Sequence, residues 1–292
     1  VDFQGESISA ASIQIYTGMD IGTAKATMEE RAQVPHHLID ICHPDESFTV
    51  ANFQEKTKEL ITDINKKDRL PMIVGGTGLY IQSVLYTYHF SDAGEDPLYR
   101  EKMEQLALKE GNNVLHSHLA QVDPLTAQRL HPNDIKRVIR ALEIHHLTGE
   151  TMVQFQKRSQ QSPYDLLLLG LNMERSLLYE RINQRVDRMV QEGLIEEVEQ
   201  LLARGYNCNY RSMQALGYKE MVAYLQGEMN KEEAIELIKK RTRNFAKRQL
   251  TWFRNMKDVV WFDLTPGYED PEDQYLRIYQ LVAGKFRQAT NI

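Results

Sequence analysis

The chain has 292 residues, of which 42% are hydrophobic and 26% charged, and its formal net charge at pH 7 is −6. This length buries a core large enough for one large domain or for a domain with an insertion. No apolar run reaches the roughly 20 residues that a membrane helix needs, and no signal peptide is recognisable, so we expect a cytoplasmic protein without a membrane partner. The two cysteines, Cys42 and Cys208, exclude a disulfide framework and a cysteine-rich zinc site. The acidic balance excludes a uniformly cationic nucleic-acid binder but not a local basic patch.

The first part of the chain alternates strand-like and helix-like segments. Residues 6–16 have the alternating, β-branched character of a strand that runs into a loop, and 69–74 is predicted to be a strand buried on both faces. Between them, 50–67 has the spacing of apolar residues that is typical of a helix. Strand, helix, strand is the pattern of a parallel sheet with right-handed crossovers.

The stretch 92–163 lacks strand signals and contains helical runs at 98–110 and 134–148. We therefore predict an α/β core, residues 1–91 and 164–292, with a mostly helical insertion over 92–163. Further strands are expected at 165–171 and 259–263. Helices are expected at 175–192, 194–204, 215–226, 231–257 and 271–287.

The segment VGGTGLY, residues 74–80, directly follows the second predicted strand. Glycines after a strand let the backbone approach a bound group, and free amides at the start of a following helix suit an anion. The segment is not a Walker loop, because no lysine follows the glycines. A tight strand-to-helix turn without a ligand explains the pattern equally well.

Residues 239–257 hold eight Lys or Arg and no acidic residue, within a chain that is acidic overall. Lys240, Arg243, Lys247, Thr251 and Arg254 fall on one helical face. Such a face favours a polyanion, and RNA fits better than a membrane because the helix lacks a wide apolar face. The alternative is a solvated face whose aromatic neighbours belong to the core.

Two further helices carry aligned cations. HPNDIKRVIRALEI, residues 131–144, presents Lys136, Arg137 and Arg140 on one side and is expected to begin near Asn133 or Asp134. Residues 177–190 place Arg181, Arg185 and Arg188 in line, where arginines can hold a diphosphate through forked hydrogen bonds. Pairing of these arginines with Glu180, Asp187 and Glu192 is the structural alternative.

Several motifs together resemble the bacterial tRNA dimethylallyltransferase (isopentenyltransferase) family. They are SIQIYTGMDIGTAKA, VPHHLIDI, VGGTGLYIQSV, HPNDIKRVIRALEI, LYERINQRVDRMVQEGLIEEV, QALGYKEM and AKRQLTWFRN, and they cover nearly the whole chain in order. The resemblance implies a P-loop-kinase-like parallel sheet core with helices on both faces and a helical, tRNA-binding insertion. It also implies transfer of the dimethylallyl group of dimethylallyl diphosphate to N6 of the adenosine just 3′ of the anticodon, with Mg²⁺ as cofactor. The partners are then a tRNA anticodon stem-loop and dimethylallyl diphosphate, and we expect a monomer.

By position, the resemblance makes Thr77 the catalytic-site threonine and Arg185 the arginine that holds the diphosphate, with Arg181 as a helper. Gly75, Gly76 and Gly78 would shape the turn that binds the diphosphate. The tRNA contacts implied are Ser12, Ile13, Gln14, Arg100, Lys136, Arg137, Arg140, Gln214, Gly217, Tyr218, Lys219, Lys247, Arg248, Gln249, Thr251, Trp252 and Arg254.

The sequence departs from the family pattern in two places. The family has a phosphate loop with a Gly-Lys-Thr run on its first strand, and no such run is present here; the sequence begins at Val1, about where the helix after that loop should end. The family also places an aspartate, the general base, directly before the serine, and here that position is Ala11. A segment outside this sequence, a shortened chain and a genuine loss of the base remain open, and no metal ligand is identified.

Transfer of the dimethylallyl group has three requirements. The negative charge of the leaving diphosphate must be neutralised, the adenosine amine must be oriented for attack, and water must be excluded from the developing allyl cation. The target base is expected to be extruded from the anticodon arm into a channel lined by the Ser12 and Thr77 segments.

Two alternative functions are open. A nucleotide kinase or an adenylate isopentenyltransferase on the same core leaves the basic helices unexplained. A non-enzymatic RNA-binding protein is favoured only if the losses at Ala11 and the phosphate loop are real.

Overall fold

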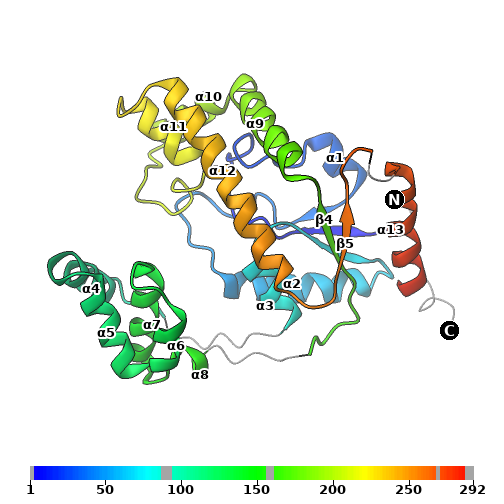
Figure 1. Ribbon diagram of the computed structural model, residues 1–292. Coiled ribbons are helices and arrows are strands. Elements are labelled where there is room, and N and C mark those ends of the chain that lie inside the picture. The colour runs from blue at the N-terminus through cyan, green and yellow to red at the C-terminus, as the bar shows by residue number, and fades with distance from the viewer. Residues whose placement is uncertain (1–2, 87–93, 156–160, 268–269, 287–292) are drawn as a thin grey trace. The chain divides into compact units, whose positions relative to one another are not determined.

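The computed structural model describes residues 3–86, 94–155, 161–267 and 270–286 (Figure 1). The chain forms two compact units, one of Val1–Ile81 with Asp165–Ile292 and one of Gln82–Tyr164. The predicted insertion, 92–163, falls within the second unit, and its predicted boundary at 91–92 lies outside the described residues. No helix among the described residues is long and apolar enough to cross a membrane.

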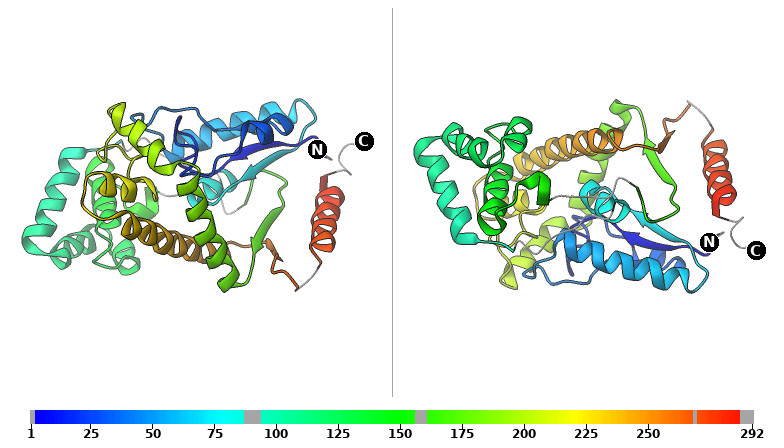
Figure 2. Two further views of the ribbon diagram at one scale, coloured as in Figure 1. Left: turned by 90° about the horizontal axis from the view of Figure 1, so that it is seen from above. Right: turned by 90° about the horizontal axis from the view of Figure 1, so that it is seen from below.

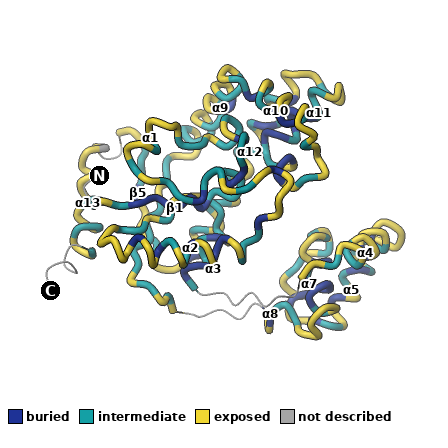
Figure 3. The backbone as a smooth tube through the Cα atoms, turned by 180° about the vertical axis from the view of Figure 1, so that it is seen from behind, coloured by how far each residue is buried: buried dark blue, intermediate teal, exposed yellow. Residues whose placement is uncertain are grey.

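The first unit contains a three-stranded parallel sheet in the order β2-β1-β3. Its strands are β1 (Glu6–Ser9), β2 (His36–His37) and β3 (Pro71–Val74). Helix α2 (Val50–Asn65) connects β2 to β3 and packs on β1 and β3. The predicted strand, helix, strand unit with parallel pairing is confirmed. β1 is buried along its whole length because it is the middle strand (Figure 3).

Two strand expectations differ from the structure. The predicted strand at 69–74 was expected to be buried on both faces, but Met72 and Val74, which lie on the same face of β3, are 37% and 57% exposed, so that face is only partly covered. The strands β4 (Leu168–Asn172) and β5 (Val259–Asp263) pair in parallel with each other. Among the described residues they form a second sheet, so the strands do not make one continuous sheet. The predicted 6–16 strand ends at Ser9, where the loop begins.

The start and the orientation of helix α2 follow from its capping residues and its buried face. Its N-cap, Thr49, accepts a hydrogen bond from the Asn52 amide, and the Asn52 side chain accepts one from the Thr49 amide. This reciprocal capping satisfies donors that a helix start leaves free. Phe53 is fully buried, and its ring stacks on Tyr80 at 4.3 Å. The cap and the buried face together fix where α2 begins and which side faces the sheet.

Five helices follow β4, and four of them pack on one another. The helices α9 (Arg175–Gln191), α10 (Leu194–Ala203), α11 (Tyr218–Leu225), α12 (Lys231–Arg254) and α13 (Pro271–Phe286) lie within a few residues of their predicted bounds. α12 contacts both α9 and α11, and α10 contacts α9 and α11 (Figure 2). A capping box of Asn230 and Glu233 starts α12. The Phe3 ring contacts Tyr279 of α13 at 5.0 Å.

Two short elements of the first unit were not predicted, namely β2 and α1 (Met28–Gln33). The helix expected directly after the glycine turn is present as α3 (Gly78–Leu85), which starts within the glycine segment. Segments of two to eight residues are too short for periodicity to separate a helix or strand from a turn. β2 exists because its backbone pairs with β1, which no local pattern encodes.

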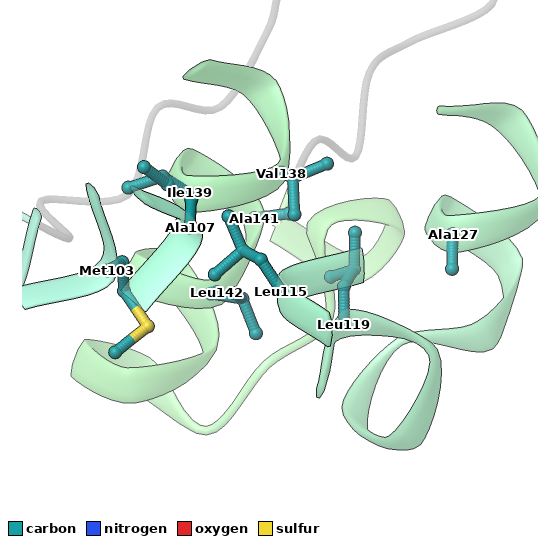
Figure 4. Close-up of a cluster of buried hydrophobic side chains, with 9 residues drawn as sticks. All are labelled: Met103, Ala107, Leu115, Leu119, Ala127, Val138, Ile139, Ala141 and Leu142. Atoms are coloured by element: carbon teal, nitrogen blue, oxygen red, sulfur yellow. The ribbon is translucent and has the colours of Figure 1, made fainter. Parts of the chain in front are cut away.

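The second unit is all-helical in its described residues and has its own core. Its helices are α4 (Pro97–Glu110), α5 (Asn112–Val122), α6 (Pro124–Arg129), α7 (Ile135–Thr148) and α8 (Met152–Phe155). Figure 4 shows the buried side chains that α4, α5, α6 and α7 contribute to one cluster, with Leu115, Leu119, Val138 and Ala141 fully buried. α7 begins directly after Asp134, as predicted, although the Asp134 side chain pairs with Arg137 at 3.1 Å and does not cap the helix.

Candidate functional site

The carboxyl ends of β1 and β3 bring two predicted site segments together. The Ala10 amide donates to the Val74 carbonyl at 2.8 Å, and the Thr77 amide donates to the Ala10 carbonyl at 3.0 Å. The Thr77 hydroxyl then accepts a hydrogen bond from the Ser12 amide at 3.2 Å. Ligands of parallel α/β sheets commonly bind at this end of the strands. The predicted juxtaposition of the Ser12 and Thr77 segments is therefore present in the structure.

Gly75, Gly76 and Gly78 lie against protein atoms. A Cβ at Gly75 would lie 2.4 Å from the Ala10 carbonyl carbon, and one at Gly76 would lie 2.0 Å from Gln249 Nε2. A Cβ at Gly78 would lie 2.3 Å from two atoms of the Trp252 indole. Ala10 and helix α12 therefore fill the space that a side chain would occupy at these glycines. Binding of a diphosphate by the backbone of the turn stays a prediction.

The segment after β1 is fixed largely by its own side chains. The Gln14 amide group accepts from the Ser9 hydroxyl at 2.8 Å and donates to the carbonyls of Thr23 and Ala24. Ser12 and Ile13 are half-buried, and the Ser12 hydroxyl makes no hydrogen bond with any described residue. Gln14 thus holds the loop in place, and Ser12 keeps a hydroxyl available.

Residues 20–22 are held by a single carboxylate from α10. Glu197 accepts hydrogen bonds from the amides of Asp20 and Ile21, at 2.8 and 2.7 Å, and of Gly22, at 3.1 Å. The Tyr218 hydroxyl donates to the same carboxylate at 2.6 Å. Burial, together with the charge of Glu197, raises the pKa of Tyr218 well above its usual range, so the hydroxyl remains a donor.

Tyr218 and Gly217 were expected to contact tRNA, but both have structural roles at the start of α11. The Tyr218 side chain is fully buried, so the structure contradicts its assignment as a direct tRNA contact. Gly217 adopts φ 96°, and its amide donates to the buried Glu220 at 2.7 Å. The positive φ explains the glycine, because other residues are strained there.

A second network, which sequence reasoning missed, closes the same loop. The Lys25 ammonium is almost fully buried and donates to the Tyr16 carbonyl, to Asp20 at 2.6 Å and to Asp40 at 2.5 Å. Arg31 also pairs with Asp40, at 2.7 Å. Burial raises the pKa of Asp40, but the hydrogen bonds from Lys25 and Arg31 outweigh it and lower that pKa, so the carboxylate stays charged.

The arginines of α9 are exposed. Arg181 and Arg185 make no hydrogen bond or ion pair with any described residue. Two of the three acidic side chains that offered an alternative have other partners: Asp187 pairs with Lys239 at 2.8 Å, and Glu180 accepts from Gln184. Glu192, the third, makes no ion pair with an arginine among the described residues. The structural alternative for these arginines is therefore absent in the described residues, and their charge is free for an anion.

The basic segment of α12 divides into two parts. Its first part packs on neighbouring helices: Lys239 pairs with Asp187, Arg243 donates to Asn183 of α9 at 2.6 Å, and Arg241 bonds the buried Glu220 of α11. Arg243, predicted to belong to the cationic face, is thus engaged with α9. The second part keeps its cations exposed, namely Lys247, Arg248 and Arg254.

The aromatic and polar residues of this second part are only partly covered. Phe245 and Trp252 are 42% and 36% exposed, so they are not core residues as the alternative required. The Arg248 guanidinium lies 5.7 Å from the Phe245 ring centroid, and the Thr251 hydroxyl donates to the Lys247 carbonyl. Arg254 lines a pocket with Asn172 and Asp263, the last residues of β4 and β5.

The remaining residues predicted to contact tRNA differ in their exposure and in whether another protein group already binds them. In the second unit, Arg100 and Arg140 both bond the fully buried Glu143, at 2.8 and 2.5 Å, which neutralises much of their charge. Burial raises the pKa of Glu143, but these bonds outweigh it and lower that pKa. Lys136 and Arg137 are exposed. Gln214 donates to the Cys208 carbonyl, and Lys219 lies 3.9 Å from Glu220.

The described residues hold no group of three or more His, Cys, Asp or Glu that could bind a metal ion. Ala11 supplies no carboxylate beside Ser12. The structure thus brings Thr77 and Ser12 together, leaves Arg185 free on α9, and adds Glu197, Lys25 and Asp40 as loop supports. Glu197 lies about 175 residues from its partners in sequence, so no local pattern could have linked them.

The chain is similar to known proteins over nearly its whole length. A family model described as IPP transferase matches residues 14–256. A tRNA dimethylallyltransferase of Geobacillus thermodenitrificans (strain NG80-2) is 51% identical over 292 residues, 99% of this chain and 91% of the relative. The crystal structure of the full-length tRNA isopentenylpyrophosphate transferase from Bacillus halodurans has a TM-score of 0.73 at 48% identity, covering 99% of this chain and 90% of that one. A eukaryotic dimethylallyltransferase acting on tRNA has a TM-score of 0.79 at 28% identity, covering 97% of this chain and 74% of that one.

Proposed function

The chain belongs to the IPP transferase family, and from this premise we propose that it transfers the dimethylallyl group of dimethylallyl diphosphate to N6 of the adenosine just 3′ of a tRNA anticodon. The observation that carries the proposal is the hydrogen bond between the Ser12 amide and the Thr77 hydroxyl at 3.2 Å, at the carboxyl ends of β1 and β3. This contact joins the two segments that the target adenosine and the diphosphate are proposed to approach.

The proposed reaction breaks the bond between the allylic carbon and the diphosphate oxygen and forms a bond from N6 to that carbon. A proton leaves N6, and diphosphate is released. Arg185, which is exposed and unpaired among the described residues, would hold the diphosphate as negative charge develops on it. The Thr77 hydroxyl would be placed at the reacting end by the Ser12 amide. The adenosine is proposed to be extruded from the anticodon loop, because N6 is otherwise not accessible to these groups.

Ala11 occupies the position where the family resemblance places a proton acceptor. A methyl group cannot take a proton, so the proton lost by N6 requires another acceptor such as water. We therefore propose that this chain transfers the group slowly and that Ala11→Asp accelerates transfer. General base catalysis typically contributes about 10²- to 10⁴-fold.

Mg²⁺ remains a proposal for the substrate complex. Mg²⁺ is usually bound through one or two carboxylates together with substrate phosphates. The described residues hold no group of three or more His, Cys, Asp or Glu that could bind the ion by themselves, so we assign no ligand residue and no step to it.

Each unit is proposed to contact tRNA separately, the first through the exposed part of α12, with Lys247, Arg248 and Arg254, and the second through Lys136 and Arg137. Phosphate contacts of this kind set affinity without reading sequence. A P-loop-kinase-like core is the proposed finer fold, supported by the parallel pairing of β1 with β2 and β3. We also propose a cytoplasmic location, since tRNA is the substrate, and a monomer.

The test is transfer of radiolabelled dimethylallyl from its diphosphate to an anticodon stem-loop in the presence of Mg²⁺, with the full-length protein. Label is expected on the stem-loop and absent from a stem-loop with guanosine at the target position. Adenosine monophosphate as the alternative acceptor distinguishes a small-molecule isopentenyltransferase. Binding of the stem-loop without transfer, by both the natural protein and Ala11→Asp, would contradict the proposal.

A further inference from the structure

Helix α12 contacts the glycine turn at two points, one helical turn apart. Gln249 Nε2 donates a hydrogen bond to the Gly76 carbonyl at 3.1 Å. The Trp252 indole lies against Gly78, where a Cβ would come within 2.3 Å of its Cδ1 and Nε1. Both side chains were predicted to contact tRNA, yet here the Gln249 amide is engaged by the protein's own turn.

The two glycines are explained by space and not by backbone conformation. Neither Gly76 nor Gly78 has a positive φ, so an alanine could adopt either conformation. The Cβ of an alanine at Gly76 would, however, lie 2.0 Å from Gln249 Nε2. The turn therefore lacks side chains at these positions because α12 lies directly against it.

Thr77 is the residue between these two contacts. On its other side, its amide donates to the Ala10 carbonyl at 3.0 Å and its hydroxyl accepts from the Ser12 amide at 3.2 Å. The turn is thus held between the loop that follows β1 and helix α12. A displacement of Gln249 or Trp252 removes one of the two supports that fix the Thr77 hydroxyl.

We propose that Gln249 and Trp252 are positioning residues of the transfer reaction, which hold the Thr77 turn and do not serve as tRNA contacts. The inference rests on the proposed function. Lys247 and Arg254, exposed on the adjoining turns of the same helix, are the residues left to bind the RNA backbone. Helix α12 then binds the RNA backbone and also fixes the position of Thr77.

The kinetic test uses Gln249→Met, which keeps the length of the side chain but removes the donor. Loss of one neutral hydrogen bond is expected to lower kcat about three- to tenfold, while the Kd of the anticodon stem-loop changes less than about threefold. Lys231→Ala, at the start of α12 and outside the basic segment, is the control and leaves both quantities unchanged. An unchanged kcat, or a Kd raised more than about threefold, would overturn the assignment.

A double-mutant cycle tests the contact itself, by thermal unfolding and without reliance on activity. Gly76→Ala is expected to lower Tm because its methyl group meets Gln249, and Gln249→Ala is expected to relieve that clash. The combined variant should therefore lose less Tm than the sum of the single losses, whereas Gly76→Ala with Lys231→Ala should be additive. Additivity in the first pair would overturn the inference. Absence of dimethylallyl transfer by both the natural protein and Ala11→Asp would instead refute the proposed function, and the thermal cycle distinguishes the two failures.

Discussion

Thr77 and Arg185 are held in very different ways. Thr77 has both its amide and its hydroxyl bonded to the segment after β1. Arg185 is exposed on α9 and has no hydrogen bond or ion pair among the described residues. An unpaired guanidinium costs little in water and can meet an incoming dianion without first breaking a bond. Thr77 is thus already in place, and Arg185 is available to be recruited.

Arg185→Ala is expected to lower kcat/KM for dimethylallyl diphosphate about 10- to 100-fold, because a charge-assisted hydrogen bond contributes roughly 1.5–3 kcal/mol. Steady-state transfer kinetics with varied dimethylallyl diphosphate measure this loss. The control is Arg175→Ala, which removes the same charge from the first turn of the same helix. Equal effects of the two substitutions would mean that only general charge matters and that Arg185 has no specific role.

Glu6 is a buried carboxylate that links β1 to His37 and Arg69. It accepts from His37 of β2 and from Arg69, at 2.6 and 2.7 Å. These hydrogen bonds, first from His37 and then from Arg69, lower the pKa of Glu6 below its ordinary value of 4.5. A lowered pKa in the folded state stabilises the fold above pH 4.5, and this contribution is lost as pH falls through the folded-state pKa.

Glu6→Gln is therefore expected to lower Tm at pH 7 and to lose its effect as the pH falls below about 4.5. Thermal unfolding of both proteins between about pH 3 and pH 7 tests this. Glu59→Gln, on the exposed side of α2 and without a side-chain partner in the described part of the chain, should show no such pH-dependent difference. A constant Tm difference at every pH would show that the packing of Glu6, and not its charge, matters.

Helix α12 combines structural and proposed binding roles along its length. Lys239, Arg241 and Arg243 connect it to α9 and α11, while Lys247 and Arg254 remain exposed. The chain has a net charge of −6, so attraction of RNA depends on this local segment and not on the protein as a whole. Because the first cations of the run bind neighbouring helices, the number of Lys and Arg in the sequence overstated how many of them α12 exposes for RNA.

The variant Lys247→Ala/Arg254→Ala is expected to bind the anticodon stem-loop more weakly and with a smaller salt dependence. Each lost phosphate contact reduces the slope of log K against log salt by roughly 0.7 to 0.9. Binding measured between about 50 and 200 mM salt gives the slope. Lys231→Ala serves as the control because it removes charge from the same helix outside the basic segment. A slope identical to that of the natural protein would contradict RNA binding by this face.

The two units of the molecule have separate cores. The second unit buries its own cluster around Leu115 and Leu119, to which only helices of that unit contribute (Figure 4). The first unit is organised around β1 and the packed helices that follow β4. Local opening of one unit is therefore possible without loss of the other's core.

Leu119→Ala is expected to destabilise the second unit by about 2–5 kcal/mol, the usual cost of removing a fully buried leucine side chain. Hydrogen exchange should accelerate in peptides from 97–148 and remain unchanged in peptides that contain β1 or β3. Leu108→Ala removes a leucine that is 80% exposed in the same unit and should leave both regions unchanged. Equal acceleration in the two units would mean that they unfold as one.

Much of the secondary structure was predictable from the sequence because its causes are local. Apolar spacing gave α2, α7, α9 and α12, and the β-branched and aromatic run at 259–263 gave β5 with the bounds found in the structure. The motifs also indicated the family before any coordinates were considered. Short elements such as β2 were not predicted, because they depend on pairing with a distant strand.

The site was predictable only in part. Motifs identified Thr77, Ser12 and Arg185, and the channel expected for the target base placed the Ser12 and Thr77 segments together. Three features of the site depend on contacts between segments up to about 175 residues apart. They are the atoms that lie against the glycines of the turn, the cations that stay unpaired in the described residues, and the groups that hold the loop at residues 20–22. Local patterns determine elements because their hydrogen bonds and apolar faces repeat along the chain. Only the tertiary structure decides whether Gln249, Tyr218 or Arg100 faces solvent or protein, because that depends on which distant segment packs beside it.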